Sequence, residues 1–362
     1  MVKKNKNKKW FIMTWVVLIC CLLLCAGITI FVDPFFHYHK PLHGVAYEME
    51  EQRYINDGII KQFEYDSVII GTSMTENFMT SEFDKLWGTR SMKVPFSAGS
   101  YREINENLTR AFEVNPDIKY VLRALDNDWL LREKDFMYYQ EDYYPDYLYD
   151  KNVWNDVNYL FNKNVLFKHI GSAVKNTLYG KSIPTFDEYS NWNADVVFSK
   201  NVVLEKYIRR DQMEIQPMTE EFKQQVLDSV DQNITSLAAK NPDTTFYLFF
   251  PPVSVVWWDN IIRAGMFEQY IESEKIAIEE FLKYDNIEIY SFSNNFDLIT
   301  DLDRYTDLIH YNEKVNSQIL HWICQGEFQL TEDSYMEYID EIRAFYRAYN
   351  YDLLFESVNI EK

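Results

Sequence analysis

The first 32 residues are the part of this sequence that most constrains the protein. Five lysines and no acid lie within residues 1–9, and the 23 residues from Trp10 to Val32 carry no charge. An apolar run of that length spans a bilayer, and it exceeds the apolar core of a cleavable signal peptide. Because lysines mark the cytoplasmic side, we expect a cytoplasmic tail at 1–9, a single transmembrane anchor at 10–32, and an extracytoplasmic remainder at the cell membrane.

The expected outer part is strongly acidic. It holds 31 basic residues against 56 acidic ones, a net charge of −25. This charge argues against nucleic acid as a partner. It is compatible with a neutral or cationic polymer, although a solvated acidic surface accounts for it equally well. Only Cys324 lies outside the apolar run, so an internal disulfide is excluded and the core must hold the fold together.

Short apolar runs alternate with helical periodicity from residue 66 onwards. This alternation is typical of a parallel sheet with helices on both faces, and it predicts a flavodoxin-like, three-layer α/β domain. The expected strands are 66–71, 91–96, 119–125, 244–250 and 287–292, and the expected helices are 73–87, 101–114, 220–239, 260–284 and 312–324.

Four segments complete the expected domain organisation. A juxtamembrane segment covers residues 33–65, and the α/β domain covers 66–330. Within that domain the alternation is lost between about 129 and 217, where Tyr, Asp, Asn and Trp are frequent, which predicts an insertion with short helices. A helical tail is expected at 331–362.

Open parallel sheets place their sites beyond the carboxyl ends of the strands. Ser73 follows the first expected strand, Gly99 the second and Asn127 the third, and Asp307 and His310 precede the helix expected at 312–324. A serine hydroxyl needs a positioned base to become a nucleophile, and that base needs a third group to fix its tautomer. Ser73, His310 and Asp307 are of these three types.

A structural explanation exists for each of these residues. Ser73 begins a Ser-x-x-Glu capping pattern, so its hydroxyl alone predicts a helix cap as readily as a nucleophile. Asp307 is equally compatible with a cap, and His310 with an ordinary surface histidine. Only the combination, with Ser73 and the Asp-x-x-His pair both at strand or helix ends, favours catalysis.

These motifs together resemble the SGNH (GDSL-like) hydrolase superfamily. The resemblance implies Ser73 as nucleophile, His310 as base and Asp307 as its orienting acid. It also implies an oxyanion hole made of the Ser73 and Gly99 N–H groups and the Asn127 side chain. Gly71-Thr72-Ser73 replaces the usual Gly-Asp-Ser, and is more similar to membrane-anchored teichoic-acid D-alanyl transfer and alginate O-acetyl transfer proteins. Leu125 stands where the Asn motif usually has glycine, which leaves Asp126 or Asp128 as alternatives to Asn127.

The sequence therefore predicts an extracytoplasmic serine esterase or O-acyltransferase that acts on an acyl ester of a cell-surface polymer or glycan. By analogy, a membrane-bound O-acyltransferase is an expected partner for transfer. No cofactor or metal is expected, because His37, His39 and His43 lack carboxylates or cysteines at ligand spacing. The alternatives are a non-catalytic glycan-binding or envelope-assembly protein on the same fold, and a cell-wall structural protein without a pocket.

Overall fold

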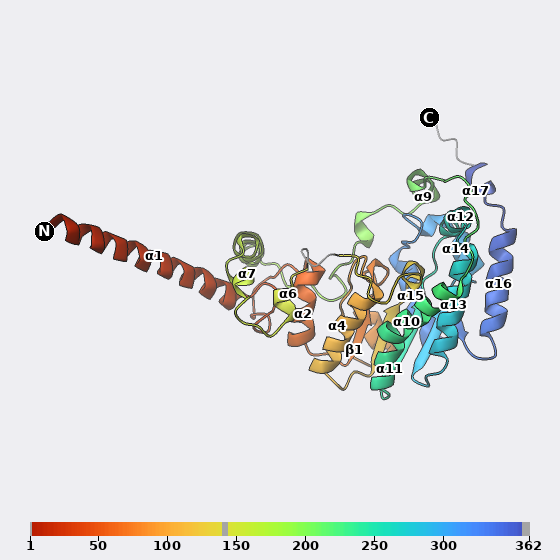
Figure 1. Cartoon of the computed structure of the whole chain (residues 1–362), viewed down its shortest axis with the longest axis horizontal. Helices are drawn as coiled ribbons and strands as arrows, with labels where there is room; N and C mark the ends of the chain where they lie inside the picture. The colour runs from red at the N-terminus through yellow and green to blue at the C-terminus, as the bar shows by residue number, and fades with distance from the viewer. Residues whose placement is uncertain (1, 140–143, 357–362) are drawn as a thin grey trace. The chain divides into compact units, whose positions relative to one another are not determined.

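The computed structural model of the chain describes residues 2–139 and 144–356 (Figure 1). The chain divides into two compact units, one made of residues 1–63 and 140–185 and the other of residues 64–139 and 186–362. Two parts of the sequence predictions, residues 140–143 of the insertion and 357–362 of the tail, lie outside the described residues.

A six-stranded sheet forms the centre of the second unit. Its strand order is β2-β1-β3-β4-β5-β6; the first five strands are parallel, and β6 runs antiparallel to β5. The first five follow the flavodoxin order, so the predicted α/β fold is confirmed. The sequence prediction missed β6. The strands are β1 (Ser67–Ile70), β2 (Ser91–Lys93), β3 (Tyr120–Ala124), β4 (Thr245–Phe250), β5 (Ile287–Ser291) and β6 (Gln329–Leu330).

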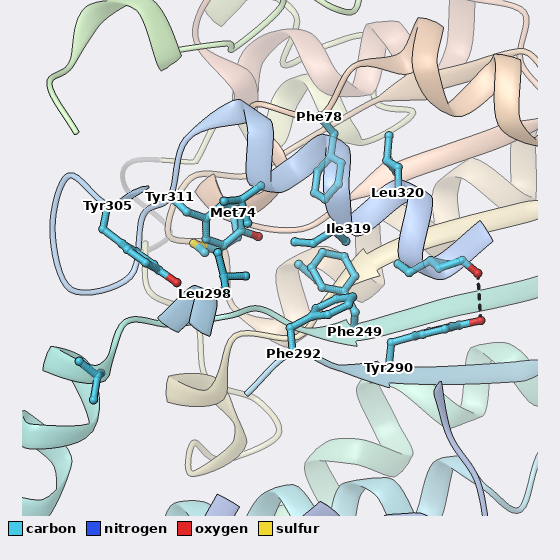
Figure 2. Packing of buried hydrophobic residues seen from close by; sticks show 14 of the residues in the cluster. Met74, Phe78, Phe249, Tyr290, Phe292, Leu298, Tyr305, Tyr311, Ile319 and Leu320 are labelled. Carbon is cyan, nitrogen blue, oxygen red and sulfur yellow. Dashed lines mark hydrogen bonds between the residues drawn. The ribbon is translucent and has the colours of Figure 1, made fainter. Parts of the chain in front are cut away.

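Helices cover both faces of this sheet. On one face, Phe249 and Phe292 of the sheet side pack into a buried cluster with Ile319 and Leu320 of α15 (Glu313–Gln325), as Figure 2 shows. On the other face, Phe112 of α4 (Tyr101–Val114) contacts Phe246, with ring centroids 6.0 Å apart. Burial of apolar side chains on both faces explains the nearly continuous apolar sequence of β4.

The helix predicted over 73–87 is interrupted in the structure. A 3₁₀ turn, η1 (Ser73–Thr75), comes first, and α3 (Thr80–Trp87) begins only five residues later. The buried Lys93 ammonium lies at the break and donates hydrogen bonds to the chain between the two elements. It donates to the carbonyl oxygens of Glu76 at 2.5 Å and Phe78 at 3.0 Å, which a continuous helix would use internally.

Further helices complete the second unit. Those between β3 and β4 are α5 (Asn127–Leu130), η4 (Asn193–Asp195), α9 (Lys200–Lys206), α10 (Glu220–Val230), η5 (Asp231–Thr235) and α11 (Ser236–Lys240). Those after β4 are α12 (Val255–Arg263), α13 (Phe267–Phe281), α14 (Phe296–Thr300), η6 (Leu302–Arg304), α16 (Tyr335–Ala348) and α17 (Leu353–Glu356).

The first unit begins with α1 (Val2–Val32), whose segment Asn7–Val32 is long and apolar enough to cross a membrane. Length and composition suit either a membrane anchor or a signal sequence. The Asp33 carboxylate directly after α1 accepts a hydrogen bond from the Tyr159 hydroxyl at 2.8 Å. The other elements of this unit are α2 (Gln52–Gln62), α6 (Asp146–Tyr149), α7 (Val157–Leu160), the π-helical segment η3 (Asn164–His169) and α8 (Ile170–Leu178).

The close approach of α2 to the chain after α1 gives a stability prediction. A Cβ atom on Gly58 would lie 1.9 Å from the Phe35 carbonyl oxygen, so Gly58→Ala must push two backbone segments apart. We expect a loss of about 1–3 kcal/mol in the free energy of unfolding. Gly171→Ala in α8 is the matched control, because nothing lies within 4 Å of its Cβ position. Denaturant unfolding in detergent measures both, and equal stability of the two variants would contradict the packing described here.

Candidate active site

Ser73 is placed by the turn that leaves β1. Gly71 permits this turn to lie close to β3, because a Cβ atom there would meet the Thr75 side chain at 2.6 Å and the Ala124 side chain at 3.3 Å. The cap of η1 is Thr72, whose Oγ1 accepts a hydrogen bond from the Met74 N–H at 3.3 Å. Ser73 is therefore not the capping residue, and its hydroxyl is available for another partner.

His310 lies in a loop that is closed on itself. Tyr305 and Tyr311 form an antiparallel bridge across its base, and the Thr306 N–H donates to the His310 carbonyl at 3.0 Å. The Ser254 N–H and hydroxyl both donate to the Leu308 carbonyl, at 3.0 and 2.7 Å. These bonds fix the loop, and with it the imidazole, beside the start of α15.

Ser73, His310 and Asp307 meet in one hydrogen-bonded chain. The Ser73 Oγ lies 2.7 Å from His310 Nε2, although 237 residues separate them in sequence. His310 Nδ1 lies 2.8 Å from Asp307 Oδ2, while Asp307 Oδ1 accepts the N–H groups of Ile309 and His310, both at 2.9 Å. Because an ionised carboxylate only accepts, Nδ1 carries the proton, and Nε2 accepts from the serine hydroxyl.

Electrostatics supports this protonation pattern. Burial of the His310 ring lowers its pKa, but the hydrogen bond and charge of Asp307, with the charges of Asp126 and Glu76, more than offset this and leave the pKa above its ordinary value. Burial raises the pKa of Asp307, yet the contacts with His310 and with two backbone N–H groups bring it below its ordinary value. Asp307 is therefore ionised at neutral pH and stabilises a proton on His310.

The other two expected oxyanion donors, Gly99 and Asn127, make hydrogen bonds within the protein. The Gly99 N–H donates to the Phe96 carbonyl at 2.6 Å. The Asn127 Nδ2 donates to Glu274 Oε2 at 3.1 Å, inside a buried group that also contains Ser291 and Tyr338. The Gly99 N–H and one of the two Asn127 Nδ2 N–H groups are therefore engaged, whereas no hydrogen bond among the described residues uses the Ser73 N–H.

Asp126, the residue before Asn127, has its carboxylate near the Ser73 turn. Its Oδ2 accepts a hydrogen bond from the Thr72 hydroxyl at 2.8 Å. Burial raises the pKa of Asp126 to about 6, against the lowering effects of Thr72 and His310. Of the three residues Asp126, Asn127 and Asp128, Asp126 is the one whose side chain contacts the nucleophile turn.

A narrow pocket contains Ser73 and His310 and adds residues that sequence reasoning missed. Asn77 Oδ1 accepts the Trp192 N–H at 3.0 Å, and the Trp192 ring meets His310 edge to face at 5.4 Å. Three buried polar atoms of the lining have no hydrogen-bond partner among the described residues; they are Asn77 Nδ2, Tyr311 OH and Asn316 Oδ1.

Lys93 fixes the backbone on both sides of Asn77 through the two carbonyl bonds described above. Burial lowers the pKa of Lys93 to about 7, and the charges of Asp187 and Glu76 oppose this only in part. A lysine at the end of an apolar strand, such as Lys93 in β2, could have indicated a buried polar contact from the sequence. The sequence does not show which groups this lysine contacts. Its contacts hold Asn77 in the pocket independently of the Trp192 bond.

The histidines near the membrane segment have other contacts in the described residues. His39 instead contacts two backbone carbonyls, those of Lys40 at 2.7 Å and Ile30 at 2.9 Å. Within residues 2–139 and 144–356, no group of three or more His, Cys, Asp or Glu side chains is placed to hold a metal ion.

Comparisons with known proteins add little to this geometry. No protein-family model matches the chain, and no curated protein matches it. Among solved structures, it is similar to one described as "a putative platelet activating factor" from Streptococcus pneumonia. That match has 13% sequence identity and a TM-score of 0.37, and covers 81% of this chain and 92% of the other. At these values the match supports no conclusion about activity.

Proposed function

We propose that this protein is a membrane-anchored, extracytoplasmic serine esterase or O-acyltransferase of the SGNH type, acting on an acyl ester of a cell-surface polymer or glycan. The observation that carries the proposal is the continuous chain from Ser73 Oγ to His310 Nε2 and from His310 Nδ1 to Asp307 Oδ2. Serine, imidazole and carboxylate in this order are the arrangement that activates a hydroxyl for acyl transfer.

Each residue then has a defined step. His310 Nε2 takes the Ser73 proton as Oγ attacks the ester carbonyl, and Asp307 stabilises the imidazolium that forms. The proton passes to the leaving alcohol, and an acyl group stays on Ser73. A second hydroxyl, from water or from a sugar or polyol, gives its proton to His310 as its oxygen attacks the acyl carbon. The bond between the acyl carbon and Ser73 Oγ then breaks, and His310 returns the proton to Oγ. Hydrolysis and transfer differ only in that acceptor, and transfer is the reaction in which a membrane-bound O-acyltransferase would supply the acyl group.

The oxyanion that develops during attack needs hydrogen-bond donors. The Ser73 N–H at the start of η1 is one, because no described residue uses it. We assign the second to Asn77 Nδ2, which is buried in the same pocket and has no partner within the part of the chain that the structure describes. Trp192 and Lys93 hold Asn77 from its side chain and its backbone, so the donor is preorganised.

Asn77→Ala tests that assignment. Loss of one oxyanion donor costs about 10²–10³-fold in kcat, with little change in KM. The rate of p-nitrophenyl acetate hydrolysis measures it. Asn191→Ala is the matched control, since the Asn191 amide bonds to Asp187 and Met79 and does not line the pocket. Equal rates in the two variants would remove Asn77 from the reaction.

A fluorophosphonate probe tests the proposed function as a whole. The full chain in detergent is expected to be labelled at one residue, Ser73, identified by mass analysis of the labelled peptide. His310→Ala is expected to lose the label, because the serine then lacks its base. A folded protein that resists labelling would instead favour the non-catalytic glycan-binding or envelope-assembly alternative.

A further inference from the structure

The first unit has an apolar surface that its own fold leaves uncovered. We use the name outer apolar face for six exposed side chains: Trp154, Val157, Phe167, Val174, Leu178 and Tyr179. Trp154 is 85% exposed, Phe167 80% and Leu178 82%. Single exposed apolar residues are common, but a group of large ones in one short segment marks an interaction site.

Helical spacing places part of this face on one stripe. Val174 and Leu178 are four residues apart in α8, so they lie on the same side of that helix, and Phe167 lies in the π-helical segment η3 that leads into it. The opposite side, with Val165 and Ala173, is buried in the unit. The helix therefore has apolar residues on both of its sides. One side packs against the rest of the unit, and the other side has no protein partner among the described residues.

The end of α1 fixes the depth of this surface, if α1 is the anchor of the proposed function. A helix of 23 residues rises ~34 Å, slightly more than the ~30 Å hydrocarbon core, so Val32 lies near the lipid headgroups. Thr29, one turn earlier, donates its hydroxyl to the Leu160 carbonyl at the end of α7, at 3.1 Å. Both α7 and η3 contact α1, and α7 lies beside its last turns in Figure 1. These elements are thus at headgroup level.

Charge in the same segment is opposite to that of the whole chain. Residues 151–181 contain five lysines and a single acid, Asp156, in a protein with a net charge of −20. One of them, Lys168, pairs with Glu51 at 2.6 Å and with Glu50 at 3.8 Å, which leaves the other four to carry the local positive charge. Lysines beside exposed aromatic and aliphatic side chains are typical of helices that lie in an anionic lipid interface.

We propose that the outer apolar face is inserted into the headgroup region of the outer leaflet, with anionic lipid as its occupant. The proposal rests on the membrane anchoring stated under the proposed function. Three observations favour lipid over a second protein: continuity with α1, the depth set by Thr29 and Leu160, and the local positive charge. The first unit would then be held at two places, which fixes its orientation on the membrane.

Depth-dependent fluorescence quenching tests this in the full chain. Cys20, Cys21, Cys25 and Cys324 are replaced by serine, and single cysteines carrying an environment-sensitive dye are placed at Phe167, Leu178 or Ile208. Ile208 is the matched control, an 89% exposed apolar residue of the second unit. In vesicles with equal amounts of phosphatidylcholine and phosphatidylglycerol, lipids brominated near the headgroup are expected to quench the dye at 167 and 178 at least about twofold more than at 208.

The other outcomes are distinguishable. A dye at Leu18 reports whether α1 is inserted, so its quenching by lipids brominated at mid-chain separates the anchor from the outer apolar face. Strong quenching at 18 with equal, weak quenching at 167, 178 and 208 overturns this proposal and leaves the anchor. Quenching at 167 that is weak at a high protein-to-lipid ratio and rises as the protein is diluted in lipid assigns the face to a second copy and also overturns it. Without phosphatidylglycerol, weaker quenching is expected at 167 and 178 only.

Discussion

Ser73→Ala is expected to lower the rate of p-nitrophenyl ester hydrolysis at least about 10³-fold and to remove fluorophosphonate labelling. The alanine lacks the Oγ that lies 2.7 Å from His310 Nε2, so no acyl-serine can form. Thermal unfolding is expected to change little, because Thr72 and not Ser73 caps η1. A large loss of activity without loss of stability separates a chemical role from a structural one.

Thr72→Ala is the control for this substitution. It removes the hydroxyl that caps η1 and that donates to Asp126, and should cost about 1 kcal/mol in the free energy of unfolding. Fluorophosphonate labelling of Ser73 should persist in that variant. If Ser73→Ala lowered the melting temperature as much as Thr72→Ala while esterase activity remained, the role of Ser73 would be structural.

The fold could be predicted because its signals are local. Strands such as β4 are short apolar runs, and the helices between them have clear periodicity, so alternation along the chain was enough to predict a parallel sheet. The short β6 was missed, since two residues, Gln329 and Leu330, carry no periodicity. Its pairing with β5 is a consequence of tertiary structure and not of local preference.

The sequence could indicate only those site residues that lie at the end of a strand or at the start of a helix. Ser73 and His310 satisfy that condition, and the structure brings them together. Asn127 also satisfies it, but its amide donates one hydrogen bond to Glu274, which is 147 residues away in sequence. A sequence motif indicates where in the fold a residue's backbone lies. It does not determine the direction of the side chain when a buried carboxyl group is also available as its hydrogen-bond partner.

The pocket residues that were missed have a common reason. Asn77 lies within the helix that the periodicity predicts. In the structure that helix is interrupted at Asn77, where Lys93 donates hydrogen bonds to the carbonyl oxygens of Glu76 and Phe78. Trp192 lies in the segment where alternation is lost, and it reaches His310 through a tertiary contact. Neither residue type is diagnostic by itself, so no sequence signal marked either one.

Asp307→Asn is expected to reduce kcat about 10⁴-fold, by analogy with triads in which the same change reverses the tautomer of the base. The asparagine Oδ1 can still accept the N–H groups of Ile309 and His310, so the loop should keep its geometry. Its Nδ2 now donates toward His310 Nδ1, which moves the ring proton to Nε2. An Nε2–H group cannot accept the Ser73 proton, and catalysis is lost without loss of the fold.

The pH profile of the remaining activity tests the electrostatic part of this argument. Asp307 raises the pKa of His310 against the lowering effect of burial, so removing its charge must lower that pKa. The base is active only when deprotonated, so activity falls as the pH decreases through the His310 pKa. The acid limb of the profile should therefore move to lower pH in Asp307→Asn. Glu313→Gln is the charge control, because its carboxylate is not among the groups that raise the His310 pKa. An acid limb at the same pH in wild type and Asp307→Asn would mean that Asp307 does not control the base.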